Sequence, residues 1–200
     1  MKELLVVRVT PDIHDASVAE IYYHAQHYNI NPSHIDISTI DELEQKLTGR
    51  KIDYLYFAGH GSETCFTDNN SFISSWEEIG NVVCRTNCLN PDSIVLLYCC
   101  KGGLNTVAYR LIAECDQISY VCGAKQNMRS IDLIIGFNVF IYNIEARNID
   151  PVLAADKATA ATEIRFECFD KTDVIANPHY HQKYCKDCPK PGDYPPQMNC

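Results

Sequence analysis

Two short stretches of the sequence place a reactive side chain between an apolar run and glycines. In "YLYFAGHGSE" the apolar run ends in Gly-His-Gly, with His60 at its centre. In "SIVLLYCCKGG" a second apolar run ends in Cys99 and Cys100, and glycines follow. A cysteine attacks as its thiolate, and a neighbouring histidine can move the protons that such an attack requires. The two stretches therefore predict thiol-dependent catalysis if the fold makes them neighbours.

The glycine after the histidine adds a second element to this chemistry. Because Gly61 has no Cβ, its amide N–H can approach a substrate carbonyl closely. Together with the N–H of Cys100 it would form a two-donor oxyanion hole, in which each donor contributes about 3 kcal/mol. Cys99 is the rival nucleophile, but neighbouring side chains on a strand face opposite ways, and the glycine spacing favours Cys100. The alternative is that His60 is a polar turn residue and Cys100 a packed thiol.

The elements that would position these residues alternate along the chain. Apolar, β-branched runs predict strands, and segments between them have helical periodicity. The predicted strands are Leu4–Val9, His34–Thr39, Asp53–Ala58, Ser93–Tyr98 and Ile118–Gly123. The predicted helices begin at Asp15, Ile40, Ser75, Gly103, Ile131 and Asp150. The helix from Ile131 is predicted to continue to Arg147, and the helix from Asp150 to Phe169. This order predicts a three-layer α/β domain, with a mostly parallel sheet and helices on both faces. Reacting groups gather beyond the carboxyl ends of such strands, where both His60 and Cys100 lie.

Composition and charge limit the classes of partner. The 200 residues predict one domain over residues 1–176, followed by a Cys-, His- and Pro-rich tail over residues 177–200. With 17 basic and 26 acidic residues the formal charge is −9, which opposes binding to nucleic acid or to an anionic membrane surface. The first apolar run is too short for a secretory signal, and no run approaches membrane-spanning length. The sequence therefore predicts a cytoplasmic location.

Eleven cysteines would suggest a disulfide framework in a secreted protein, but the missing signal argues against one. Cys84, Cys115, Cys122 and Cys168 fall within helical or strand-like patterns and are interpreted as small buried hydrophobes.

The tail contains four closely spaced metal-ligand types. His179, His181, Cys185 and Cys188 follow the pattern H-x-H-x3-C-x2-C, which could close a structural tetrahedral zinc site. The alternatives are a solvated tail or a pairing with Cys200. No cofactor is expected to be needed for the chemistry at Cys100.

The two stretches resemble the caspase-like (clan CD) cysteine peptidases, which include caspases, separases and gingipains, and most closely the CHAT domains. The resemblance spans roughly residues 50–165. It implies that His60 is the catalytic histidine, Gly61 an oxyanion donor and Cys100 the nucleophile, with Tyr98-Cys99 where CHAT domains carry Ser-Ala. The Gln-Ala that precedes the cysteine in true caspases is absent.

The family resemblance also implies a function. It indicates a regulated cysteine endopeptidase that cleaves a protein effector, in bacterial defence or cell death, under control of a separate partner protein. Separase-like enzymes carry an acidic pocket residue where this chain has Asp132, which implies cleavage after a basic residue. The alternative role for Asp132 is to cap the next helix. Two further functions remain open, an inactive caspase-like scaffold that binds partners and a zinc-binding interaction protein.

Overall fold

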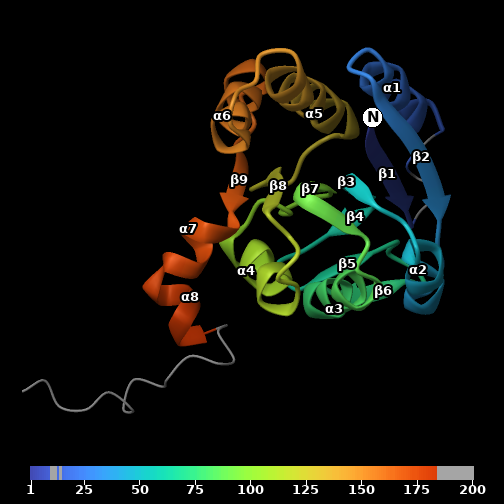
Figure 1. The fold of residues 1–200 in the computed structure, drawn as a ribbon, viewed down its shortest axis with the longest axis vertical. Helices are drawn as coiled ribbons and strands as arrows, with labels where there is room; N and C mark the ends of the chain where they lie inside the picture. The colour runs from blue at the N-terminus through green and yellow to red at the C-terminus, as the bar shows by residue number, and fades with distance from the viewer. Residues whose placement is uncertain (10–12, 14, 184–200) are drawn as a thin grey trace, which may run out of the picture.

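A six-stranded sheet forms the centre of the molecule (Figure 1). The computed structural model describes residues 1–9, 13 and 15–183. The strand order is β2-β1-β3-β7-β8-β9; neighbouring strands run parallel from β2 to β8, and β9 runs antiparallel to β8. The strands are β1 (Lys2–Arg8), β2 (Ile30–Asp36), β3 (Ile52–Ala58), β7 (Leu89–Tyr98), β8 (Tyr120–Ala124) and β9 (Phe166–Asp170).

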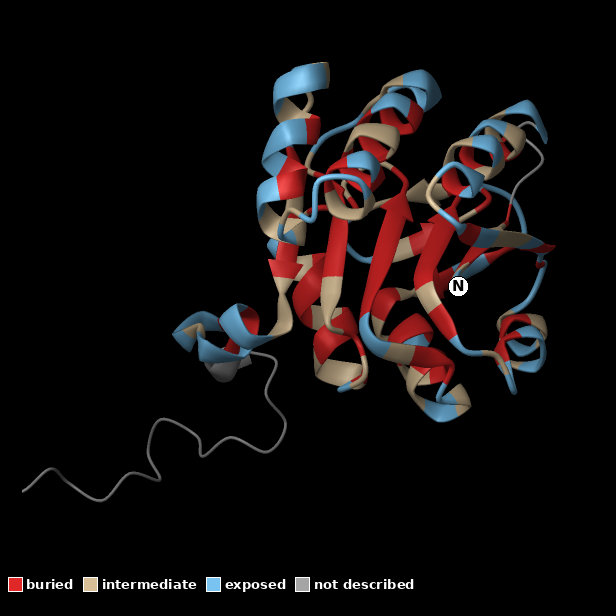
Figure 2. Ribbon diagram, turned by 45° about the horizontal axis from the view of Figure 1, so that its top comes forward, coloured by how far each residue is buried: buried red, intermediate tan, exposed pale blue. Residues whose placement is uncertain are grey.

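Helices cover both faces of this sheet because side chains alternate along each strand. Leu4 and Val6 of β1 belong to one apolar cluster, whereas Leu5 and Val7 belong to the other. The first cluster includes residues of α1 (Asp15–Gln26), α5 (Ser130–Glu145) and α6 (Pro151–Thr162), and the second includes residues of α2 (Ile40–Leu47), α3 (Trp76–Thr86) and α4 (Asn105–Glu114). Figure 2 shows buried residues along the strands and on the inner helix faces. The predicted three-layer α/β fold with a mostly parallel sheet is confirmed.

A small antiparallel sheet, absent from the predicted elements, follows β3 directly. It consists of β4 (His60–Gly61), β5 (Cys65–Thr67) and β6 (Ile73–Ser75). Phe66 anchors it, because its ring lies 5.7 Å from that of Phe57 and 5.8 Å from that of Trp76. The turn formers between β5 and β6, "TDNNS", are the sequence signal that could have predicted this hairpin.

The prediction that a helix continues to Phe169 is wrong. Helix α6 ends at Thr162, Glu163 adopts a left-handed conformation with φ 60°, and the chain then forms strand β9. In β9 Phe166 and Cys168 are buried and Glu167 between them is half-buried, which is the period of a strand. The second strand also lies earlier than predicted, at Ile30–Asp36, because its pairing with β1 begins at Ile30.

The end of the described chain packs on the α3–α4 layer. Helices α7 (Lys171–Ala176) and α8 (Pro178–Lys183) follow β9, and the ring of Tyr180 lies edge-on to that of Tyr109 at 5.6 Å. None of the helices in residues 1–9, 13 and 15–183 has the length and apolar character needed to cross a membrane.

Candidate active site

The two predicted catalytic residues leave the sheet on neighbouring strands. Strands β3 and β7 pair in parallel with Ala58 opposite Tyr98, and the N–H of Gly59 donates to the carbonyl of Tyr98 at 3.2 Å. His60 and Cys100 each lie two residues beyond this last pair. Both are half-buried at the carboxyl edge of the sheet. The register therefore brings the histidine and cysteine segments to the same edge, next to each other.

Gly61 lies directly against the cysteine pair. A Cβ at this position would lie 2.6 Å from the sulfur of Cys99 and 2.8 Å from the carbonyl oxygen of Cys100. These distances are too short for any other residue, so the absence of a side chain is what allows the two segments to meet. Cys99 is 1% exposed, and burial raises the pKa of its thiol well above the ordinary value. Its environment therefore disfavours the thiolate that a nucleophile needs.

The hairpin that carries His60 leaves the amide of Gly61 pointing away from β5. The N–H of Ser62 donates to the carbonyl of Cys65 at 2.9 Å, which makes Ser62 and Cys65 a hydrogen-bonded pair. Such pairs alternate along an antiparallel ladder, so the next pair, Gly61 with Phe66, is a non-hydrogen-bonded one. The position of Gly61 in the ladder is thus compatible with the predicted oxyanion donor.

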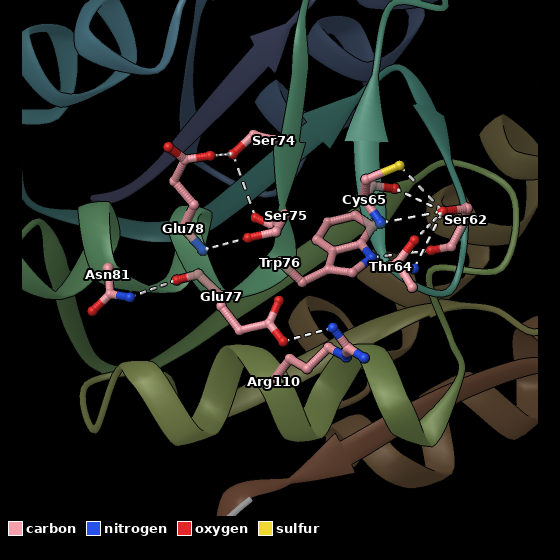
Figure 3. Close-up of polar contacts among 10 residues, drawn as sticks. All are labelled: Ser62, Thr64, Cys65, Ser74, Ser75, Trp76, Glu77, Glu78, Asn81 and Arg110. Atoms are coloured by element: carbon pink, nitrogen blue, oxygen red, sulfur yellow. Dashed lines mark hydrogen bonds and ion pairs between the residues drawn. The ribbon is translucent and has the colours of Figure 1, made fainter.

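Side-chain contacts hold this hairpin on the helix layer (Figure 3). The indole N–H of the fully buried Trp76 donates to the carbonyl of Ser62 at 3.0 Å. The hydroxyl of Ser62 accepts from the N–H of Cys65 at 3.1 Å and closes the turn. In the next residue of α3, the carboxylate of Glu77 pairs with Arg110 of α4 at 2.6 Å. The chain from His60 is thereby tied to α4, the helix that follows Cys100.

The loop after Cys100 is held by backbone contacts with β8 and with the residues just after it. The N–H of Gly103 donates to the carbonyl of Ala124 at 2.8 Å, and that of Lys101 donates to Gln126 at 3.3 Å. A Cβ at Gly103 would lie 2.2 Å from the carbonyl oxygen of Gly123. Only a glycine lets the two backbones approach this closely.

A backbone carbonyl that the sequence did not point to lies beside Cys100. The thiol of Cys100 points toward the carbonyl oxygen of Met128, 4.0 Å from its sulfur. The segment after β8 is fixed there because the hydroxyl of Tyr98 donates to the carbonyl of Ser130 at 2.9 Å. This carbonyl oxygen is therefore placed to accept a hydrogen bond from the Cys100 thiol.

Asp132 lies in the first turn of α5, close along the chain to Met128. The N-terminal capping position belongs to Arg129, so the alternative that Asp132 caps the helix is wrong. Both oxygens of Asp132 accept from the guanidinium of Arg129 at 3.0 Å. The hydrogen bond from Arg129 lowers the pKa of Asp132. Asp132 is therefore an ionised carboxylate that already has a basic partner.

The predicted zinc ligands fall at the limit of the described residues. His179 is exposed on α8, and its N–H donates to the side chain of Asn177 at 2.9 Å. The side chain of His181 and residues Cys185 and Cys188 lie outside the described residues. The zinc prediction therefore stays a prediction.

Comparison with solved structures gives a similarity in fold. No protein-family profile and no curated protein matches the sequence. Among solved structures, an inactive zymogen of a C11 protease from Parabacteroides distasonis is similar, with a TM-score of 0.51 at 10% sequence identity. The similarity covers 88% of this chain and 64% of the other, so the chain spans slightly less than two thirds of that protein. At this identity the comparison shows a shared caspase-like fold.

Proposed function

We propose that this chain is a cysteine endopeptidase in which Cys100 is the nucleophile and His60 the acid-base group. His60 takes the thiol proton, and the sulfur of Cys100 attacks the carbonyl carbon of the scissile peptide. The carbon–nitrogen bond then breaks as the imidazolium gives its proton to the leaving amine, which leaves a thioester on Cys100. Water loses a proton to His60 and attacks the thioester, and the carbon–sulfur bond breaks to release the acid as the imidazolium returns the proton to the sulfur of Cys100.

The observation that carries this proposal is the contact between the two strand ends. Gly61 touches the carbonyl of Cys100, and His60 directly precedes Gly61. The amides of Gly61 and Cys100 are the proposed oxyanion donors. Cys99 is disfavoured as the nucleophile because its thiol is buried and its pKa is raised. The resemblance of both stretches to CHAT domains, and the similarity in fold to a C11 protease, support the same reaction class.

The contact between Cys100 and Met128 supports a regulated enzyme. The thiol of Cys100 is directed at the carbonyl of Met128, 4.0 Å from its sulfur, so that the segment after β8 engages the thiol. We propose that a separate protein partner, or a bound substrate, moves the segment after β8 and releases the thiol. A cytoplasmic protease of bacterial defence or cell death, activated by such a partner, fits this proposal.

The first experiment is covalent labelling followed by intact-mass measurement. Peptidyl acyloxymethyl ketones would be reacted with the wild type and with Cys100→Ala, Cys99→Ala and His60→Ala. We expect one adduct in the wild type and Cys99→Ala, none in Cys100→Ala, and a rate about 100-fold lower in His60→Ala. An adduct that persists in Cys100→Ala would exclude this nucleophile. If circular dichroism shows folded protein but no probe reacts, even with the segment after β8 cut by limited proteolysis, the chain is an inactive scaffold.

We further propose that Asp132 selects a basic residue at the cleavage site. A substrate arginine would replace Arg129 on the carboxylate, since both offer the same bidentate donors. Arg129→Ala should therefore speed labelling by an arginine probe, and Asp132→Asn should slow it about tenfold, relative to an aspartate probe used as the control. Equal effects on both probes would show that Asp132 acts on the fold and does not select substrates.

A further inference from the structure

A second pair of cysteines lies opposite each other in the sheet, away from the nucleophile. Cys122 of β8 pairs with Cys168 of β9 in the antiparallel ladder. Their exposed fractions are 0% and 5%, and both belong to the apolar cluster under α5 and α6. Both are thiols in the structure, and their side chains are in hydrogen-bonding contact. The mechanism proposed above uses neither of them.

The ladder fixes which kind of pair these cysteines form. At one end the N–H of Lys171 donates to the carbonyl of Ser119 at 2.9 Å, and at the other the N–H of Lys125 donates to that of Arg165 at 2.9 Å. Hydrogen-bonded and non-hydrogen-bonded pairs alternate, and counting from either end makes the cysteine pair a non-hydrogen-bonded one. Opposite Cα atoms in such a pair are about 4.5 Å apart, within the range that a disulfide spans.

The same two strands support the loop of the nucleophile. Gly123, next to Cys122, contacts the backbone of Gly103, and Ala124 accepts the hydrogen bond of the Gly103 amide. Strand β9 is at the edge of the described sheet and pairs there with β8 alone, while the hydroxyl of Thr159 also bonds its first residue, Phe166. A covalent link across this edge would therefore reduce the opening of β9 and steady the segment on which the loop after Cys100 rests.

We propose that Cys122 and Cys168 close to a cross-strand disulfide when the protein meets a disulfide oxidant such as oxidised glutathione, and that this bond locks β9 and the loop after Cys100. When β9 opens at the sheet edge and exposes the pair, the thiolate of one cysteine attacks the oxidant and releases one glutathione thiolate. The second cysteine attacks the mixed disulfide and releases the other. The two cysteine protons pass to the two glutathione thiolates, so two cysteines are oxidised and one glutathione disulfide is reduced.

The test maps the bond and measures its effect on the wild-type chain. The protein would be refolded in oxidised or reduced glutathione, alkylated, digested and analysed by mass spectrometry. We expect a cross-linked peptide joining Cys122 to Cys168, a Tm about 10 °C higher in the oxidised sample, and exchange of the Gly103 amide about tenfold slower. Cys168→Ala, treated in the same way, should show neither the Tm gain nor the slower exchange.

Two results would overturn the proposal. Recovery of Cys122 and Cys168 as alkylated thiols from folded, oxidant-treated protein would show that the pair does not close. A contact between the half-buried Cys84 and the buried Cys115 offers a competing disulfide. A link found only between those two cysteines would likewise show that Cys122 and Cys168 do not close. A Cys122–Cys168 link with unchanged Gly103 exchange would refute the effect on the active-site loop. None of these readouts depends on peptidase activity.

Discussion

The two segments that meet at the candidate site are supported in different ways. We call residues 59–75 the histidine arm and residues 99–104 the cysteine arm. Side chains hold the histidine arm, through the hydrogen bond from Trp76 to Ser62 and the aromatic contacts of Phe66. Backbone contacts hold the cysteine arm, through the close approach of Gly103 to Gly123 and the hydrogen bond to Ala124. The two arms meet where Gly61 packs on Cys99.

We infer from this difference that the position of Cys100 is more tightly constrained than that of His60. Backbones in direct contact leave no room for a side chain, so the position of Cys100 depends on glycines that tolerate no substitution. The hairpin of the histidine arm is held by the indole of Trp76 and the hydroxyl of Ser62, so it can shift when either side chain is changed. It should still fold, because its other packing contacts remain. We therefore expect substitution of the glycine that positions the cysteine arm to lower stability most, and changes to the side chains that hold the histidine arm to slow labelling of Cys100 at a smaller cost in stability.

The largest effect is expected for Gly103→Ala. The new Cβ would lie 2.2 Å from the carbonyl oxygen of Gly123, and neither backbone can move without breaking the hydrogen bond to Ala124. We expect a loss of about 4 kcal/mol in the free energy of unfolding, measured by urea denaturation. The reciprocal change, Gly123→Ala, should cost a similar amount, and the double variant should lose less than the sum. A wild-type midpoint for Gly103→Ala would refute the close-contact interpretation.

Gly61→Ala tests the point where the two arms meet. Its Cβ would lie 2.6 Å from the sulfur of Cys99, and we expect a loss of about 3 kcal/mol and slower labelling of Cys100. Cys99→Ala alone should cost about 1 kcal/mol, because it leaves a small cavity. The double variant removes the clashing sulfur, so it should be more stable than Gly61→Ala alone. Strictly additive losses in these three variants would mean that Gly61 and Cys99 do not share this space.

Trp76→Phe weakens the support of the histidine arm without changing His60 or Cys100. The change removes the N–H that donates to the Ser62 carbonyl and should cost about 2 kcal/mol. We expect labelling of Cys100 to slow several-fold, because the hairpin that carries His60 is held less firmly. Phe72→Leu is the control, since Phe72 packs on the same ring of Phe66 but makes no side-chain hydrogen bond. If both variants label at the wild-type rate, the hairpin does not position His60 through Trp76.

The layers of the fold could be predicted from the sequence because the strands and most helices have clear periodicity. The apolar strand around Leu55 and the charged, periodic helix at Ile40–Leu47 both lie where they were expected. Strand β9 could not be separated from the preceding helix, because an alanine-rich segment runs into it with no glycine or proline between. The end of helix α6 depends on the left-handed conformation of Glu163, and the position of β9 depends on the packing of Phe166 against Gly136. The second of these is a contact between residues far apart in the sequence.

The candidate site could be predicted only in part. The glycines around His60 and Cys100 marked the two strand ends, and the strand register agrees with their proximity. The carbonyl of Met128 could not be predicted, because a backbone atom has no residue type that distinguishes it. The ion pair between Arg129 and Asp132 is visible in the sequence as an i, i+3 pair, but an acid in that position is equally consistent with a free pocket carboxylate.

The smallest effect is expected for a charged contact between the arms, that of Lys101 with Glu63. The ammonium of Lys101 lies 3.8 Å from the carboxylate of Glu63, and the two side chains are 40% and 61% exposed. Water and salt screen such pairs, so a double-mutant cycle with Glu63→Gln and Lys101→Met should give a coupling of about 0.5 kcal/mol or less. The labelling rate of Cys100 should stay within about twofold of the wild type in all three variants. A coupling above about 1 kcal/mol, or a large change in the labelling rate, would mean that a salt bridge as well as glycine packing joins the two arms. The two arms would then be supported in less distinct ways than the structure indicates.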